Sequence, residues 1–289
     1  MSDMQSDERK LNDLTFQHIP APDSAAEVRR RHASNRAAWN EVAVHAYRKD
    51  QDERIAFLKS GQSNMHPVEK RNLGDLGSWC NLAIHMQCAS GRDTLSLLNE
   101  GAQRVVGIDI SEEHIANARA TSDALDVPAT WYACDVLDAP HELDGTADLV
   151  YTGRGAMCWL NDLDSWAAVV FRLLKPGGKF HVLDDHPFVW LFDPDATSPV
   201  YFDIDYFAHC ETSRGWPGSY VGNFIPIEEQ APKFERLWTL SSIVNALIGA
   251  GLTIEKLGEH PEDYWPSFPN LDEKYRGKIP LTFSILARK

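Results

Sequence analysis

Two aspartates close successive apolar runs of the sequence, and their chemistry and spacing suggest a binding site for adenosine. Asp109 ends the run "VVGID" and Asp135 ends the run "WYACD". A carboxylate at the end of the second strand of a nucleotide-binding sheet accepts hydrogen bonds from ribose hydroxyls. A carboxylate after the third strand can accept one from the adenine amino group. Taken singly, either aspartate could instead cap the helix that follows it.

The segment "HMQCASGRDT", residues 85–94, precedes both aspartates and lies between an apolar run and a helical pattern. A nucleotide-binding fold has its glycine-rich turn at this point, but this segment contains one glycine, Gly91. We expect positive φ to be most useful at Gly91, nearest the helix start. We expect φ to stay negative at Ala89, because a Cβ is tolerated there. Asp93 is expected to stabilise the N-terminus of the following helix.

Short apolar runs alternate with helical patterns around these residues. Such alternation predicts parallel strands joined by right-handed crossovers, an α/β fold of the Rossmann-like three-layer type. The expected strands are Leu82–Met86, Val105–Ile108, Thr130–Ala133, Ala147–Tyr151 and Lys179–Leu183, then "LTIEKLGEH" and "LTFSILARK", with helices at Thr94–Glu100, Glu112–Leu125 and Leu163–Leu174. The last two strands lie close together near the C-terminus, which predicts an antiparallel last strand in a seven-stranded sheet.

The rest of the chain divides around this sheet. Residues 1–24 are polar and acidic and are interpreted as a flexible leader, and residues 25–78 as an N-terminal helical cap. The main domain is expected at 79–289. Within it, the alternation lapses at about 187–237, a stretch rich in aromatic and turn residues. Since ligands bind outside the carboxyl ends of the strands in open α/β sheets, this insertion after the fifth strand is expected to cover the site.

Composition narrows the function classes. The formal net charge of −14 argues against nucleic acid as the main partner. No apolar run approaches the roughly 20 residues that span a bilayer, and no targeting signal is evident, so we expect a cytoplasmic protein. The five cysteines form no C-x-x-C pair, which suggests neither a disulfide framework nor a metal site.

From about Leu82 to the C-terminus the chain resembles class I S-adenosylmethionine-dependent methyltransferases of small molecules, through "AIHMQCASG", "VVGIDIS", "ACDVLD", "ADLVYTG" and "LKPGGKF". The resemblance implies methyl transfer, with S-adenosylmethionine as cofactor and S-adenosylhomocysteine as product. It implies that Asp109 binds the ribose, Asp135 the adenine amino group, and the loop the methionine portion. The expected cofactor-binding residues are His85, Gln87, Ala89, Gly91, Thr94, Asp109, Ile110, Asp135, Val136, Thr152 and Gly153.

The loop is a variant of the family's opening motif, an acidic residue followed by alternating glycines. His85 stands at the acidic position, and Gln87 and Ala89 stand at glycine positions. Since a histidine does not supply a dependable negative charge, the cofactor's ammonium group is expected to bind loop carbonyls together with Thr152 or Gly153.

Candidate catalytic residues follow the fifth strand. "VLDDHPF" places Asp184, Asp185 and His186 at the mouth of the expected site. His186 is the first candidate for a base because histidine titrates near neutrality, although a histidine before proline could merely cap a turn. Tyr206 and His209 in the insertion are further candidates.

Aromatic residues and one arginine are candidates for binding the substrate. They are Trp39, His45, Arg154, Trp159, Tyr201, Trp216, Tyr220 and Trp265. Some of these aromatics are expected in the core, and a subset could form a cage for a ring or a cationic amine. Arg154 could bind a carboxylate or form a surface ion pair.

Three functions remain open at this point. The first is methyl transfer to a small-molecule acceptor, most simply at oxygen or nitrogen, by a monomer or homodimer. The second is binding of S-adenosylmethionine without transfer. The third, a nicotinamide-dependent dehydrogenase, is weakened by the missing G-x-G-x-x-G, whose glycines admit a pyrophosphate.

Overall fold

The computed structural model describes residues 8–11, 14–48, 50–216 and 225–289. Its main sheet contains seven strands in the order β10-β11-β7-β6-β3-β4-β5. They are β3 (Leu82–Met86), β4 (Arg104–Asp109), β5 (Ala129–Ala133), β6 (Ala147–Gly153), β7 (Leu174–Asp185), β10 (Thr253–His260) and β11 (Thr282–Arg288). Strand β11 runs antiparallel to both neighbours, and the other pairs are parallel. The predicted seven-stranded α/β sheet with an antiparallel last strand is confirmed.

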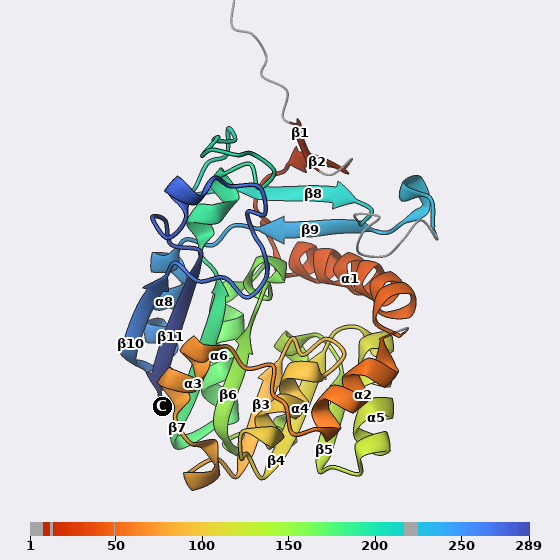
Figure 1. Ribbon diagram of the computed structural model, residues 1–289, viewed down its shortest axis with the longest axis vertical. Coiled ribbons are helices and arrows are strands. Elements are labelled where there is room, and N and C mark those ends of the chain that lie inside the picture. Colours follow the sequence, from red (N-terminus) through yellow and green to blue (C-terminus); the bar gives the residue numbers. More distant parts are fainter. Residues whose placement is uncertain (1–7, 12–13, 49, 217–224) are drawn as a thin grey trace, which may run out of the picture.

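Helices cover both faces of this sheet (Figure 1). Helices α6 (Leu163–Leu173) and α8 (Leu240–Gly249) bury Trp166 and Ile243 against one face. Helices α2 (Gln51–Lys59), α3 (Pro67–Leu73), α4 (Arg92–Asn99) and α5 (Glu112–Leu125) bury Leu58, Leu73, Leu95 and Ile115 against the other. Short helical turns occupy Leu76–Ser78, Val136–Asp138, His141–Leu143, Met157–Trp159, Pro187–Leu191, Ile227–Glu229 and Glu273–Tyr275. Burial of these apolar helix faces is the main force that holds the three layers together.

A second, antiparallel sheet stands above the carboxyl ends of the first (Figure 1). Its order is β1-β2-β8-β9, with β1 (Glu8–Leu11), β2 (Leu14–His18), β8 (Cys210–Arg214) and β9 (Pro232–Arg236). Part of the segment expected to be a flexible leader therefore forms strands. Leu14 and Phe16 are buried while Thr15 and Gln17 are exposed, and this period-two pattern gives β2 one apolar face to bury.

Helix α1 (Ala25–Val42), extended by one π-helical turn at Ala43–Tyr47, lies between the two sheets (Figure 1). The amide of Asn35 fixes it to β9: Nδ2 donates to the Phe234 carbonyl at 2.9 Å, and Oδ1 accepts from the Phe234 N–H at 2.7 Å. Helix α1 and the insertion therefore form one layer over the end of the main sheet. No helix in the described ranges combines the length and apolarity that crossing a membrane requires.

Candidate functional site

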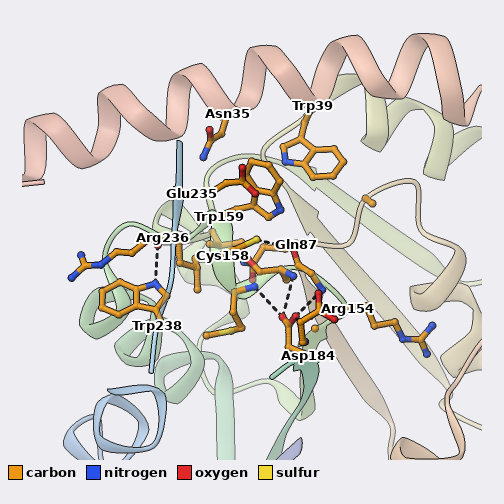
Figure 2. A pocket seen from close by; sticks show the side chains of 18 of the residues that line it. Asn35, Trp39, Gln87, Arg154, Cys158, Trp159, Asp184, Glu235, Arg236 and Trp238 are labelled. Atoms are coloured by element: carbon orange, nitrogen blue, oxygen red, sulfur yellow. Dashed lines mark hydrogen bonds between the residues drawn. The ribbon is translucent and has the colours of Figure 1, made fainter. Parts of the chain in front are cut away.

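A cavity of about 480 Å³ lies at the carboxyl ends of β3 to β7, beneath α1 and β9. Strand β3 pairs with β4 on one side and β6 on the other, so the order of the strands reverses there. This is the point at which open α/β sheets bind ligands. Figure 2 shows the lining side chains converging from the sheet below and from Asn35 and Trp39 of α1 above.

The loop after β3 has left-handed backbone at three alternate positions, although only one of them is a glycine. The φ angles of Gln87, Ala89 and Gly91 are 56°, 44° and 78°. The expectation of a negative φ at Ala89 is wrong. Left-handed backbone costs a residue with a Cβ about 1–2 kcal/mol, and hydrogen bonds offset this cost: the Ala89 N–H donates to Asp109 Oδ2 at 2.7 Å, and Gln87 Nε2 donates to the Ala156 carbonyl at 3.0 Å.

Asp109 stands at the end of β4 and lines the cavity. Its other oxygen, Oδ1, accepts from the Ser111 N–H at 2.9 Å. Burial raises the pKa of Asp109 to about 6, and backbone hydrogen bonds from Ser111 and Ala89 act in the opposite direction. The carboxylate is therefore oriented by the backbone and has its second lone pairs available for hydroxyl donors.

Asp135 begins the turn after β5 and is held from above by α1. Its Oδ2 lies 2.7 Å from His32 Nδ1 and 2.9 Å from Arg29 Nη1, while Oδ1 accepts from the Leu137 N–H. Burial acts to raise the pKa of Asp135, but the hydrogen bond and charge of His32, the Leu137 N–H and the charge of Arg29 together lower it. Asp135 is thus an ionised acceptor in the cavity wall.

Some of the other expected cofactor-binding residues line the cavity, and the rest support the loop after β3. Gln87, Ala89, Ile110, Val136 and Gly153 line the cavity, and His85, Gly91, Thr94 and Thr152 do not. His85 is buried, its Nδ1 lies 2.8 Å from Thr94 Oγ1, and burial lowers its pKa to about 4. Thr152 Oγ1 donates to Gln87 Oε1 at 3.1 Å. These four residues shape the loop from behind.

The guanidinium group of Arg154 belongs to a buried ion-pair network. Nη2 lies 2.6 Å from Glu69 Oε2, and Nη1 lies 3.3 Å from Asp93 Oδ1. Glu69 also accepts from the Tyr151 hydroxyl. Figure 2 shows the guanidinium group turned away from the centre of the cavity. Arg154 contributes to the lining, and its positive charge is directed toward α3 and α4.

His186, Tyr206 and His209, the base candidate and the two further candidates in the insertion, lie outside the cavity lining. His186 Nδ1 accepts from the Phe188 N–H at 3.1 Å, and Nε2 lies 2.9 Å from Glu259 Oε1, so this histidine caps a turn. His209 Nε2 lies 2.7 Å from Glu211 Oε2 on β8. The Tyr206 ring packs on Phe207. The structure does not bring these three residues together with the cofactor residues.

Four of the candidate substrate residues other than Arg154 line the cavity: Trp39, Trp159, Trp216 and Trp265. The Trp39 ring lies 5.1 Å from Trp159 and 4.7 Å from Trp216 between centroids. Two of the others do not line the cavity. Tyr201 is 65% exposed and packs on Phe192, and His45 lies in the π-helical turn away from the lining. Tyr220 lies outside the described residues.

Several lining residues were not anticipated: His32, Asn35, Cys158, Trp190, Glu235 and Trp238. A signal was available for α1, because His32, Asn35 and Trp39 recur at helical spacing and share one face. No such signal was available for Glu235 and Trp238 on the β9 side of the cavity, because nothing in the local sequence "APKFERLW" indicates which residues face a ligand.

Asp184 and Asp185 end β7 at the far side of the cavity from Asp135. Asp184 accepts from the backbone N–H groups of Gly155, Ala156 and Met157 at 2.8–3.0 Å. Burial and the charge of Asp184 raise the pKa of Asp185 to about 7, and its Oδ1 accepts no hydrogen bond within the described part of the chain. Among the described residues no cluster of three or more histidines, cysteines or acids could hold a metal ion.

The comparisons with known proteins agree with this geometry. Residues 84–178 match the family described as "Methyltransferase domain". No curated protein matches the chain. A solved S-adenosylmethionine-dependent methyltransferase from Mesorhizobium loti shares 24% identity and a TM-score of 0.54, with 77% of this chain and 96% of that chain covered.

Two further solved structures are similar. A putative S-adenosylmethionine-dependent methyltransferase from Listeria monocytogenes is 20% identical, with a TM-score of 0.51 and coverage of 76% of this chain and 95% of that chain. Geranyl diphosphate C-methyltransferase from Streptomyces coelicolor A3(2), solved with Mg²⁺, geranyl-S-thiolodiphosphate and S-adenosyl-L-homocysteine, is 16% identical, with a TM-score of 0.52 and coverage of 75% and 72%. At these identities the structures establish the fold.

Proposed function

We propose that this chain, which carries a class I methyltransferase domain with residues 84–178 at its centre, transfers a methyl group from S-adenosylmethionine to a small-molecule acceptor. The observation that carries the proposal is that Asp109 and Asp135, at the ends of neighbouring strands, line one cavity with the left-handed loop at Gln87 and Ala89. A nicotinamide dinucleotide fits less well, because the side chains at positions 87 and 89 stand where a pyrophosphate needs glycines.

The residues present fit an S-adenosylmethionine molecule. Asp109 has a backbone-oriented carboxylate for the two ribose hydroxyls, and Asp135 has one for the adenine amino group. Ile110 and Val136, which also line the cavity, would supply apolar contacts beside them, and Gly153 with the loop at Gln87 and Ala89 would bind the methionine portion. The loop variant keeps the required backbone shape, which favours a working site over a lost one.

The proposed methyl transfer requires little covalent chemistry from the protein. When bound, the cofactor supplies an electrophilic methyl group on a sulfonium. The protein orients the acceptor in line with it and excludes water, and such positioning can be worth roughly 7–11 kcal/mol. Helix α1 and the insertion, with Trp39, Trp159 and Trp216 in the cavity wall, would enclose the acceptor, and an oxygen or nitrogen nucleophile is the simplest choice.

Calorimetric binding of S-adenosylmethionine and S-adenosylhomocysteine tests the proposal directly. Asp109→Ala should weaken binding about tenfold or more, because loss of a charged hydrogen-bond partner costs about 1.5–3 kcal/mol. Asp123→Ala, the same change at an exposed site on α5, should leave affinity unchanged. Absence of binding by folded wild-type protein would refute the proposal. Binding without formation of S-adenosylhomocysteine from any acceptor would favour the binding protein instead.

A cytoplasmic location, a monomeric or homodimeric state and the absence of nucleic-acid partners remain predictions from the sequence.

A further inference from the structure

The part of the cavity beyond the ends of β6 and β7, here called the acceptor end, has an unusual chemistry. Six indole rings line the cavity as a whole, those of Trp39, Trp159, Trp190, Trp216, Trp238 and Trp265. Two of them are fixed through their N–H groups: Trp216 Nε1 donates to the Ala38 carbonyl at 3.2 Å, and Trp238 Nε1 to the Leu160 carbonyl at 2.9 Å. These two indoles can therefore offer an acceptor their apolar faces and edges but not their N–H groups.

Three acidic side chains contribute to the acceptor end. Asp184, Asp185 and Glu235 line it together with Cys158. Burial raises the pKa of the Cys158 thiol well above its usual range, and the charges of Glu235, Asp184 and Asp185 raise it further. Figure 2 shows Glu235 above Cys158 and Asp184 below it, so acids from β9 and β7 lie on either side of this thiol in the cavity.

The basic side chains nearby direct their charges elsewhere. The Arg236 guanidinium lies 3.6 Å from the centroid of the Trp238 ring and donates to the Asn161 carbonyl, and that of Arg154 pairs with Glu69. Figure 2 shows these two guanidinium groups at opposite margins of the cavity. Lys233 lies outside the lining, with Nζ 4.2 Å from the Trp216 ring centroid. The indole cluster thus already accommodates one ammonium group on its outer side.

We propose that the methyl acceptor is an amine carried on an apolar or aromatic framework, bound at the acceptor end by Asp185 and Glu235 and by the surrounding indoles. Carboxylates form their strongest hydrogen bonds with cationic N–H donors, and indole faces attract cations. Among the described residues, a carboxylate- or phosphate-bearing acceptor would meet three acids, while the guanidinium groups of Arg154 and Arg236 are engaged by Glu69 and Trp238. This inference rests on the proposed function and assigns the substrate class of the same site.

The amine would bind protonated and must lose that proton before it can react. Asp185 is the acceptor for the proton. Burial and the charges of Asp184 and Asp263 raise its pKa to about 7, which allows proton exchange near neutrality, and the hydrogen bond with Tyr264 acts in the opposite direction. The freed nitrogen lone pair forms the new N–C bond, the C–S bond breaks, and its electron pair stays on sulfur. The products are a thioether and an N-methylammonium ion, and the charge is conserved.

Matched probes test the substrate class in protein loaded with S-adenosylhomocysteine. We would compare 2-phenylethylamine and tryptamine with 2-phenylethanol and tryptophol and with 3-phenylpropionate and indole-3-propionate, by calorimetry. The amines should bind about tenfold more tightly than either counterpart. Glu235→Gln should remove most of this preference, whereas Glu228→Gln, at an exposed acid of the insertion, should leave it unchanged.

A second readout separates binding from proton transfer. With S-adenosylmethionine, Asp185→Asn should slow formation of the N-methylated product at least about tenfold and flatten its pH profile, while amine affinity changes less. Alcohols or carboxylates that bind as well as the amines would overturn the inference, as would S-adenosylhomocysteine binding with no amine binding at millimolar concentration. Failure of the wild-type protein to bind S-adenosylhomocysteine would overturn the proposed function as well, so the two failures are distinguishable.

Discussion

His32 Nδ1 lies 2.7 Å from Asp135 Oδ2, and the other ring nitrogen of His32 accepts from the Asn161 N–H at 3.1 Å. Because Nε2 accepts, the proton of a neutral ring must be on Nδ1, which therefore donates to the aspartate. One side chain of α1 thus connects the turn after β5 with the loop before α6. Helix α1 does more than cover the cavity, since it orients the carboxylate assigned to the adenine.

His32→Ala should therefore weaken binding of S-adenosylhomocysteine. Loss of a hydrogen bond to a charged partner leaves Asp135 less well oriented, and we expect about a tenfold decrease in affinity. Arg36→Ala is the matched control, since Arg36 lies on the same helix and forms an exposed ion pair with Glu112. Isothermal titration calorimetry of both variants checks this prediction, and equal affinities would contradict it.

Cofactor affinity should depend on pH through Asp109. The pKa of Asp109 is raised by burial to about 6, and the ribose hydroxyls bind the ionised form. Affinity should therefore be constant above about pH 7 and should fall by up to tenfold per pH unit below pH 6. Asp109→Asn should give weaker binding with a flatter profile. A wild-type profile that is flat from pH 5 to 8 would refute this role.

The raised pKa of Asp109 has the opposite effect on the folding stability of the ligand-free protein. A carboxyl whose folded pKa lies above its unfolded value holds its proton more tightly in the folded state. Asp109 therefore favours folding below its unfolded pKa, and this contribution is lost as pH rises through about 6. Thermal unfolding without ligand should show that Asp109→Asn gains stability relative to wild type at pH 8 and less at pH 4.

Gly91→Ala should destabilise the fold more than an ordinary glycine replacement. A Cβ at Gly91 would lie 2.5 Å from Trp131 Cη2 and 2.9 Å from Ala118 Cβ, and φ is 78°. Gly145→Ala is the matched control, because φ is 65° there and nothing lies within 4 Å. Backbone strain is common to both, so the difference in unfolding free energy should be about 1–3 kcal/mol, the cost of overpacking. Urea unfolding measures this difference, and equal losses would contradict the crowding.

Glu69→Ala should be strongly destabilising, although Glu69 belongs to no strand of the site. Its carboxylate is fully buried against Arg154 and Tyr151, so its removal leaves a buried guanidinium without its main partner. Breaking such a pair costs about 3–5 kcal/mol. Asp272→Ala, which breaks the exposed pair with Lys274, should cost about 0–1 kcal/mol. Equal effects in denaturant unfolding would show that the Arg154 network does not support the site.

The sequence by itself determined the main sheet and the position of the two aspartates that we propose bind adenosine. Strand–helix alternation from Leu82 onward follows from local periodicity, and a strand end fixes where the next residue must lie. For that reason Asp109 and Asp135 could be placed correctly at the cavity from sequence position alone. The need for special backbone at Gly91 was equally local.

Only the tertiary structure determined which residues line the rest of the cavity. Whether His186 faces the cavity or Glu259 depends on the path of the chain after β7, and no periodicity encodes that path. Glu235 and Trp238 reach the cavity because β9 pairs with β8 and packs on α1, which lies about 200 residues earlier in the sequence. The left-handed φ of Ala89 likewise depends on Asp109, 20 residues away, accepting its N–H. Long-range packing and hydrogen bonds, which local sequence does not specify, determine the positions and backbone conformations of these residues.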